Sequence, residues 1–287
     1  MKKFNFVLIV FTILSSCAEQ NNDSLFKVEE VAPWCILGFD ILDRTPTQRI
    51  EMLKELGFTK YGYNRGKGTF DEMKEEFALA KQNNIEITSV FLWLNAKRDS
   101  LNKLSPANQT LLNNLREVEH KPTIWVSFSD NYFEHIGQDQ SVELAIKMIT
   151  YVKSLADELS CKLALYNHHG WFGNPFNQLE ILEKLGDKSL TMVYNFHHAQ
   201  EYIDRFPEIA EKITPHLSYV NLNGVKKEGP QIIAVGEGDA ELDMIRELIG
   251  QGYKGPWGIL GHIKTEDVKK VLEKNISGLK LLNAELK

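Results

Sequence analysis

Cysteine is scarce in this 287-residue chain, with three residues, at positions 17, 35 and 161. This excludes a disulfide-rich scaffold, and we interpret Cys35 and Cys161 as small hydrophobic side chains, because their neighbours are apolar. Basic residues are also limited: 33 Lys and Arg stand against 39 Asp and Glu, a formal charge of −6. No basic stripe runs along the chain, which argues against nucleic acid as a partner.

Several motifs that mark common enzyme classes are missing. The chain has no Gly-x-Gly-x-x-Gly after its first apolar segment and no phosphate-loop lysine motif, so nucleotide binding has no support. Neither Gly-x-Ser-x-Gly nor His-Glu-x-x-His occurs, which removes the main argument for a serine hydrolase or a zincin. The glycine-rich stretch 236–239 is better interpreted as a turn that caps a helix beginning near Asp239.

The N-terminus has the features of an export signal. Two lysines precede the mainly apolar run 4–14, which is shorter than the roughly 20 residues of a membrane span. The run ends in Leu-Ser-Ser-Cys at Cys17, which resembles the lipobox of bacterial lipoproteins. We expect residues 1–16 to be a signal peptide, Cys17 to carry a lipid and residues 17–30 to form a polar tether on the periplasmic side or cell surface. The alternatives are a plain cleaved signal peptide and a buried, unmodified Cys17.

Short apolar segments alternate with amphipathic segments along residues 31–287, as in repeated βα units. Residues 45–48, Thr-Pro-Thr-Gln, form a capping box with proline at the first helical position, and Gly57 ends that helix. Eight strands alternating with eight helices favour a single-domain, closed (β/α)8 TIM barrel over an open doubly wound sheet. The expected strands are 34–40, 60–64, 86–95, 123–130, 162–168, 190–197, 217–223 and 255–261. The other expected helices are 70–82, 105–119, 140–159, 177–185, 206–213, 241–250 and 265–282.

Five of the eight histidines stand where expected strands end: His168, His169, His197, His198 and His262. The carboxyl ends of parallel strands meet at one rim of a barrel, where TIM-barrel enzymes place their active sites. We therefore expect a site at this rim. Because side chains alternate along a strand, His197 and His198 both face the interior only if the strand has already ended.

The second half of the chain resembles the xylose isomerase-like TIM barrels, which include sugar phosphate isomerases and epimerases and the family 2 apurinic endonucleases. The segments that carry the resemblance are 162–168, 192–199, 235–239 and 252–256. The element order agrees over 31–287, so the resemblance implies this barrel and an enzyme of sugar chemistry. The acidic balance, the export signal and the ligand changes described next disfavour the endonuclease.

The resemblance implies a divalent metal held by carboxylates and one histidine on the last four strands. The corresponding positions here are Tyr166, Asn195, Asn221 and Leu260. None is a strong ligand for magnesium or manganese, so the family's metal-bound proton transfer does not carry over. Two alternatives stay open: His168, His198 and His262 rebuild a site for a divalent metal such as zinc or manganese, or imidazoles act without metal.

The resemblance places His198 at a substrate-contacting histidine and Asn167-His168 at an Asn-His pair. The candidate catalytic residues are His168, His197 and His198, with His198 or His168 as the base. The candidate substrate contacts are Asn167, Asn195, Asn221, Asn223, Trp171, Trp93 and Asp40. Asparagines are neutral donors for an oxyanion, and aromatic faces stack on sugar rings. Alternatively, these Asn and His side chains only close hydrogen bonds among the rim loops.

These residues predict an enzyme that abstracts a proton beside a carbonyl of a sugar or glycoside. An isomerase or epimerase is the first hypothesis, and a lyase that uses the same enolate is the second. A non-catalytic, lipid-anchored carbohydrate-binding protein is the third. Cations suited to phosphate are few on the rim loops, namely Arg65, Lys67, Lys226 and Lys227, so an unphosphorylated ligand is favoured.

Overall fold

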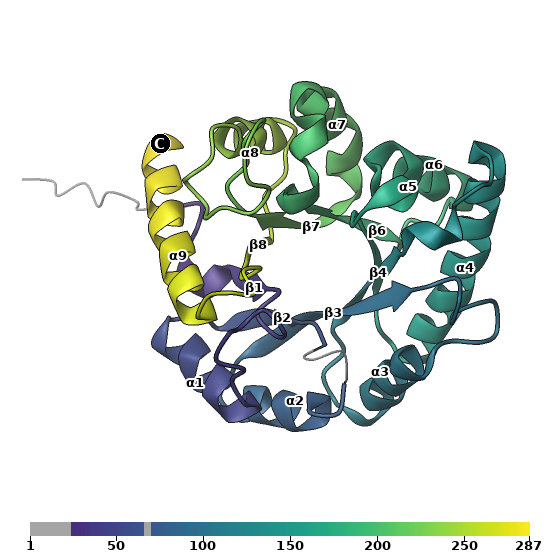
Figure 1. Cartoon of the computed structure of the whole chain (residues 1–287), viewed down its shortest axis with the longest axis horizontal. Helices are drawn as coiled ribbons and strands as arrows, with labels where there is room; N and C mark the ends of the chain where they lie inside the picture. The colour runs from purple at the N-terminus through teal and green to yellow at the C-terminus, as the bar shows by residue number, and fades with distance from the viewer. Residues whose placement is uncertain (1–23, 66–69) are drawn as a thin grey trace, which may run out of the picture.

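The computed structural model describes residues 24–65 and 70–287. The expected signal peptide, Cys17 and the first part of the expected tether lie outside the described residues. Eight parallel strands form one sheet in the order β1-β8-β7-β6-β5-β4-β3-β2, which curves into a barrel surrounded by helices (Figure 1). The strands β1 and β2 lie next to each other without ladder pairing among the described residues, so the barrel is nearly closed. The predicted (β/α)8 barrel is confirmed.

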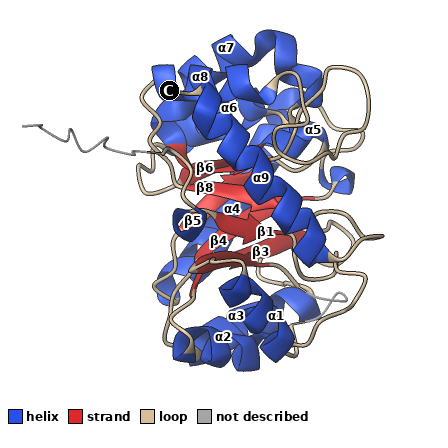
Figure 2. Cartoon of the chain, turned by 90° about the vertical axis from the view of Figure 1, so that its left-hand side faces the viewer, coloured by secondary structure: helices blue, strands red, loops and turns tan. Residues whose placement is uncertain are grey.

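The elements follow the expected alternation, with strands in the barrel wall and helices outside (Figure 2). The strands are β1 (Ala32–Trp34), β2 (Lys60–Tyr63), β3 (Glu86–Leu94), β4 (Thr123–Phe128), β5 (Leu163–Tyr166), β6 (Thr191–Asn195), β7 (Leu217–Leu222) and β8 (Trp257–Leu260). The α-helices are α1 (Pro46–Glu55), α2 (Met73–Gln82), α3 (Pro106–Glu117), α4 (Gln138–Glu158), α5 (Gly170–Gly173), α6 (Pro175–Leu185), α7 (Phe206–Ile213), α8 (Glu241–Gly250) and α9 (Val268–Glu285). The 3-10 turns are η1 (Val28–Glu30), η2 (Asp130–Tyr132), η3 (Phe196–His198), η4 (Gln200–Arg205) and η5 (Thr214–His216).

Several strands are shorter than expected at their carboxyl ends. The prediction of a first strand at 34–40 was wrong in its bounds, because Cys35 has φ 58° and turns the chain out of the sheet. The turn expected at 236–239 does precede a helix, which starts two residues after Asp239. The helix α8 begins at Glu241, whose carboxylate accepts hydrogen bonds from the backbone N–H groups of Gly236, Gly238 and Val225.

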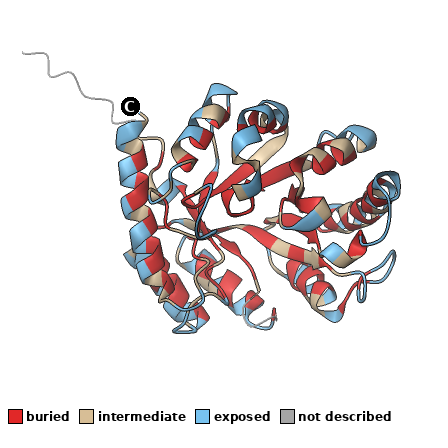
Figure 3. Cartoon of the chain, turned by 45° about the horizontal axis from the view of Figure 1, so that its top comes forward, coloured by how far each residue is buried: buried red, intermediate tan, exposed pale blue. Residues whose placement is uncertain are grey.

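The core has two parts, one inside the barrel and one between the sheet and the helices. Buried residues lie along the strands and on the sides of the helices that face the sheet (Figure 3). Trp34 lies inside the barrel, with its ring 4.5 Å from that of Trp125, and Trp125 stacks on Tyr166 at 5.7 Å. A Cβ at Gly62 would lie 2.3 Å from the Trp34 ring, so this position on β2 requires glycine. The barrel interior is thus filled with aromatic rings beneath the rim.

A buried ion pair joins α1 and α2. Arg49 donates to both carboxylate oxygens of Glu76, at 2.7 and 2.8 Å, and the Tyr61 hydroxyl donates to the same carboxylate at 2.8 Å. Both charged side chains are buried, so this bidentate pair connects two helices with β2 where little water is present.

Residues 26–30 pack on the barrel, so the predicted tether, which ran to residue 30, was wrong over this part. Phe26 is buried, and its ring lies edge-on to Trp257 with centroids 5.4 Å apart. Asn283 of α9 bonds both the N–H and the C=O of Phe26, at 2.9 and 2.8 Å. An apolar ring with satisfied backbone groups favours this docked position over solvent.

Within 24–65 and 70–287, no helix has the length and apolar character needed to cross a membrane.

Candidate functional site

A cavity of about 620 Å³ lies at the carboxyl-terminal rim of the barrel. The last residues of β1, β5, β6 and β8 all line it, in agreement with the expected location. Its aromatic and apolar lining consists of Trp34, Cys35, Leu37, Phe39, Phe91, Tyr166 and Leu260. Its polar lining includes four histidines, namely His168, His197, His198 and His262.

The loop after β5 presents two of the rim histidines. Its backbone turns at once, because the His168 N–H donates to the Tyr166 carbonyl at 2.9 Å. Gly170 has φ 62°, and a Cβ there would lie 2.0 Å from Asp130 Oδ1. A Cβ at Gly173 would lie 2.7 Å from the His168 carbonyl oxygen. Gly173 therefore lets α5 pack tightly against the loop that carries His168, and Gly170 lets the start of α5 lie close to Asp130.

The end of β6 explains how His197 and His198 both reach the cavity. The strand ends at Asn195, and the Asn195 side chain accepts a hydrogen bond from the His197 N–H at 3.0 Å, which starts the 3-10 turn η3. In a 3-10 turn, neighbouring side chains no longer alternate between opposite faces. The condition derived from the sequence, that the strand must already have ended, is met.

Five imidazole rings gather at the rim, and we call them the imidazole cluster: His168, His169, His197, His198 and His262. The centroid of the His198 ring lies 4.6 Å from His168, 4.4 Å from His169 and 4.4 Å from His197. The His262 ring lies 4.9 Å from that of His197. Rings from three separate strand ends thus form one continuous group.

Three members of the cluster can bind one metal ion. Nitrogen atoms of His168, His169 and His198 lie within 4.8 Å of one another. This trio differs from the predicted set, because His169 takes the place of His262. The reason is that His262 follows β8 and contacts His197 instead. Three imidazoles with an open position for water or substrate are a common zinc site.

Burial keeps four imidazoles of the cluster uncharged, those of His168, His197, His198 and His262. It lowers the pKa of His168 to about 2, with the charges of neighbouring histidines adding to the effect. Burial likewise lowers the pKa of His197 and of His262 to about 4, and it lowers that of His198 strongly. The buried Nδ1 atoms of these four residues have no hydrogen-bond partner among the described residues. At neutral pH they therefore present lone pairs that a metal ion or a proton can take.

The four positions at which the sequence resemblance implies a metal do not fit one here. The Tyr166 hydroxyl accepts hydrogen bonds from Trp34 Nε1, at 3.2 Å, and from Asn195 Nδ2, and burial raises the pKa of this phenol. Asn221 is fully buried but does not line the cavity, and Leu260 is apolar. Without an anionic ligand, this set is a poor site for a hard divalent cation.

The asparagines proposed as substrate contacts divide into different roles. Asn167 holds β5 and β6 together, because its Oδ1 accepts from Asn195 N at 2.6 Å and its Nδ2 donates to Asn195 O at 3.3 Å. Asn223 donates to the carbonyls of Gly224 and Gln231. Of the four predicted asparagines, Asn195 lines the main cavity, while Asn167, Asn221 and Asn223 lie outside its lining.

The two tryptophans predicted as substrate contacts lie in different places. Trp93 lines a smaller adjoining cavity, and its ring lies 4.5 Å from that of His168. Trp171 lies outside both linings, where it donates to Gln138 at 2.7 Å and packs on Phe133. The sequence does not distinguish a tryptophan at a cavity, such as Trp93, from one such as Trp171, which belongs to α5 and bonds to α4.

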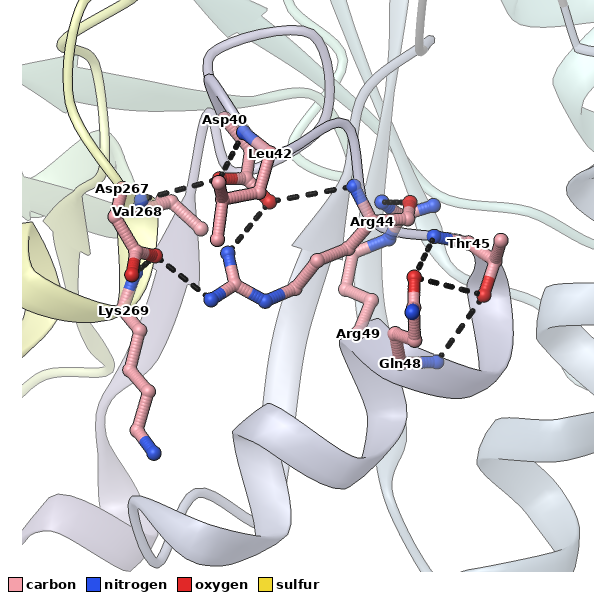
Figure 4. A network of polar contacts seen from close by, with 9 residues as sticks. All are labelled: Asp40, Leu42, Arg44, Thr45, Gln48, Arg49, Asp267, Val268 and Lys269. Carbon is pink, nitrogen blue, oxygen red and sulfur yellow. Dashed lines mark hydrogen bonds and ion pairs between the residues drawn. The ribbon is translucent and has the colours of Figure 1, made fainter.

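Asp40 lines the main cavity, but its carboxylate is engaged in a network of the rim loops (Figure 4). Arg44 donates to Asp40 at 2.7 Å and to Asp267 at 2.7 Å. The other Asp40 oxygen accepts from the N–H groups of Leu42 and Val268. Asp40 thus joins the loop before α1 to the beginning of α9, which positions two sides of the cavity.

Sequence reasoning missed several residues of the site. Phe91 and Cys35 line the main cavity, and Arg98 lines the smaller one. Lys264, after β8, was also missed as a lining residue. Phe91 lies within a continuous apolar strand and Arg98 within a polar loop, so neither has a local signal. The doublet after Tyr166-Asn167 offered a signal for His169 as a ligand.

No family model matches this chain, and no curated protein matches it in sequence. Solved structures do match. A xylose isomerase domain containing protein from Salmonella typhimurium LT2 is 13% identical and superimposes with a TM-score of 0.63, covering 90% of this chain and 99% of the other. This chain has the fold of the xylose isomerase-like barrels. The 3-keto-D-glucoside 4-epimerase from E. coli gives 13% identity, a TM-score of 0.62 and coverage of 89% and 100%. The IolI protein, solved with a zinc atom, is 10% identical and superimposes with a TM-score of 0.67, covering 89% of this chain and 99% of the other.

Proposed function

We propose that this xylose isomerase-like barrel is an enzyme that moves a proton on the carbon beside a carbonyl group of a sugar or glycoside, as an isomerase or epimerase. The observation that supports it most is the imidazole cluster, of which four uncharged rings line a cavity of about 620 Å³ together with aromatic side chains. The cavity has a size that suits a small molecule. An aromatic floor suits the C–H face of a sugar ring.

The first requirement of this chemistry is a base that is unprotonated at neutral pH. His197 and His262 meet it, because burial holds the pKa of each near 4 and their rings lie side by side at 4.9 Å. One imidazole accepts the substrate proton, and the resulting imidazolium can return it to the same or a neighbouring carbon. His168 and His198 remain the candidate bases if the trio binds no metal.

The second requirement is stabilisation of negative charge on the carbonyl oxygen. We propose that His168, His169 and His198 hold a divalent ion for this purpose, and zinc suits three imidazoles best. Such an ion supplies a Lewis acid that polarises the carbonyl oxygen. The zinc atom in the IolI structure supports a metal in this fold, although the ligand set proposed here is this chain's own.

The experiment that tests the proposal is exchange of substrate hydrogen with D2O, followed by NMR. D-fructose, D-tagatose and a methyl 3-keto-glucoside serve as probes, because each has a carbonyl beside a C–H group. We expect exchange with at least one probe, its loss in His197→Ala and His198→Ala, and its retention in His216→Ala. His216 lies in η5, before β7 begins, and is remote from the carboxyl-terminal rim.

The products separate the related hypotheses. Exchange with inversion or with migration of the carbonyl identifies an epimerase or isomerase, whereas loss of a substituent identifies a lyase. Binding of a probe without exchange under any metal condition would instead identify a carbohydrate-binding protein and would contradict the proposal.

A further inference from the structure

A smaller cavity of about 180 Å³ adjoins the main one, and the two share Arg65 and Phe91 in their linings. Phe91 and Trp93 give the small cavity apolar walls, while Arg65 and Arg98 contribute guanidinium groups. The Trp93 ring also lies edge-on to His168. A ligand held over the imidazole cluster could therefore extend a substituent toward the two arginines.

These two guanidinium groups have no hydrogen-bonded anionic partner among the described residues. Neither side chain forms a hydrogen bond or ion pair with any residue in 24–65 or 70–287. Asp99 acts on Arg65 electrostatically, but its oxygens already accept hydrogen bonds from Asn95 N, Ser105 N and Asn108 Nδ2, at 2.9, 2.7 and 2.9 Å. The Asp99 carboxylate is thus used to hold its own loop.

The two arginines act on each other. Burial lowers the pKa of Arg65, and the positive charge of Arg98 lowers it further. Two like charges beside an apolar wall are unfavourable unless an anion joins them. Guanidinium groups bind carboxylate and phosphoryl oxygens through paired N–H donors, and aromatic walls reduce the screening by water.

We propose that Arg65 and Arg98 bind an oxyanion substituent of the substrate, a carboxylate or a phosphoryl group, while the reacting carbon lies at the imidazole cluster. The inference rests on the proposed function for the reacting end and adds the substrate class: a sugar acid or sugar ester that carries negative charge. The shared lining of the two cavities lets one molecule occupy both.

Calorimetric titration tests this without requiring turnover. The probes are D-glucuronate and D-galacturonate for a carboxylate, the 6-phosphates of D-glucose and D-galactose for a phosphoryl group, and the two neutral sugars. We expect one anionic class to bind at least about 10-fold more tightly than its neutral partner at low salt, with the preference falling as salt rises. The class that binds tighter identifies the oxyanion.

Single variants then assign the effect. Arg65→Gln and Arg98→Gln should each reduce the ratio of anionic to neutral sugar affinity by about 10-fold. Arg116→Gln is the matched control, because Arg116 is exposed on α3 and bonds to Asn113. Equal binding of all probes, or a preference that survives in both variants, would overturn the inference. If D2O exchange occurs without anionic preference, this inference alone fails; if the preference appears without exchange, the proposed function fails instead.

Discussion

The imidazole rings of His168 and His198 lie 4.6 Å apart, although one follows β5 and the other belongs to the turn after β6. The pairing of β5 with β6, in which Tyr166 stands opposite Val193, brings the two loops together. Asn167 adds hydrogen bonds from its side chain to the backbone at the end of β6. The distance between the candidate ligands thus depends on the β5–β6 pair, which is held by backbone pairing and by the Asn167 side chain.

Metal content distinguishes the trio from the set expected from the sequence. We expect the purified protein to contain close to stoichiometric zinc after supplementation, measured by inductively coupled plasma mass spectrometry. His169→Ala should weaken zinc binding by about 100-fold or more, because a ligand is lost, whereas His262→Ala should bind zinc nearly as tightly as the unmodified protein. Loss of zinc in His262→Ala with retention in His169→Ala would contradict the assignment.

Stability should depend on pH through His262. Histidine in an unfolded chain has a pKa near 6.5, and burial lowers that of His262 to about 4. Between these values the unfolded chain binds more protons, so the free energy of unfolding falls as pH drops from about 6.5 toward 4 and is unaffected above that range. His262→Asn should remove on the order of 1 kcal/mol of this loss between pH 7 and 5. The measurement is urea unfolding with EDTA present, and His216→Asn should leave the pH slope unchanged.

The buried pair Arg49–Glu76 should be critical for folding. Glu76→Gln leaves the Arg49 charge buried without its partner, which should reduce the free energy of unfolding by about 3 to 5 kcal/mol. Glu72→Gln is the matched control, because Glu72 is the N-cap residue of α2, four residues before Glu76. Its carboxylate lies 3.9 Å from Arg49 and is 61% exposed, so we expect a loss below about 1 kcal/mol. Similar losses in both variants, measured by chemical denaturation, would show that burial does not decide the effect.

Export and lipid attachment remain a prediction from residues 1–17. Expression in a bacterium supplied with labelled palmitate should give a labelled, membrane-associated protein, and Cys17→Ser should abolish the label. Cys35→Ser is the control, because Cys35 lies in the barrel at the cavity. Release of an unlabelled protein by the unmodified sequence would instead support a plain cleaved signal peptide.

Local signals predicted much of the fold. The capping box at Thr45 and Gln48 forms as expected, with both reciprocal hydrogen bonds, and α1 begins at Pro46. The helices α7 and α8 have the expected bounds, because strong amphipathic periodicity is a property of neighbouring residues. Strand ends were less predictable: the positive φ of Cys35 arises where the chain leaves the barrel, and nothing in the adjacent residues signals it.

The sequence predicted the rim at which the candidate site lies, but it did not predict the contacts between the side chains there. Histidines after β5, β6 and β8 do meet at one rim, since parallel strands end on the same side. Their pairwise contacts were not readable, because they depend on the turn η3 and on how far β8 stands from β5. The arginines of the small cavity show the same limit: Arg65 and Arg98 follow β2 and β3, and each appears in the sequence as an ordinary loop cation.

The sequence by itself determined the alternation of strands and helices, the single barrel and the edge at which the histidines gather, because these follow from periodicity and from the direction of parallel strands. Tertiary structure alone decided that His169 joins His168 and His198, that Asp40 pairs with Arg44, and that Asn167 fastens two strands. The physical reason is distance. Hydrogen bonds and metal coordination act over a few ångströms, and only the closed packing of the barrel sets which side chains come that close.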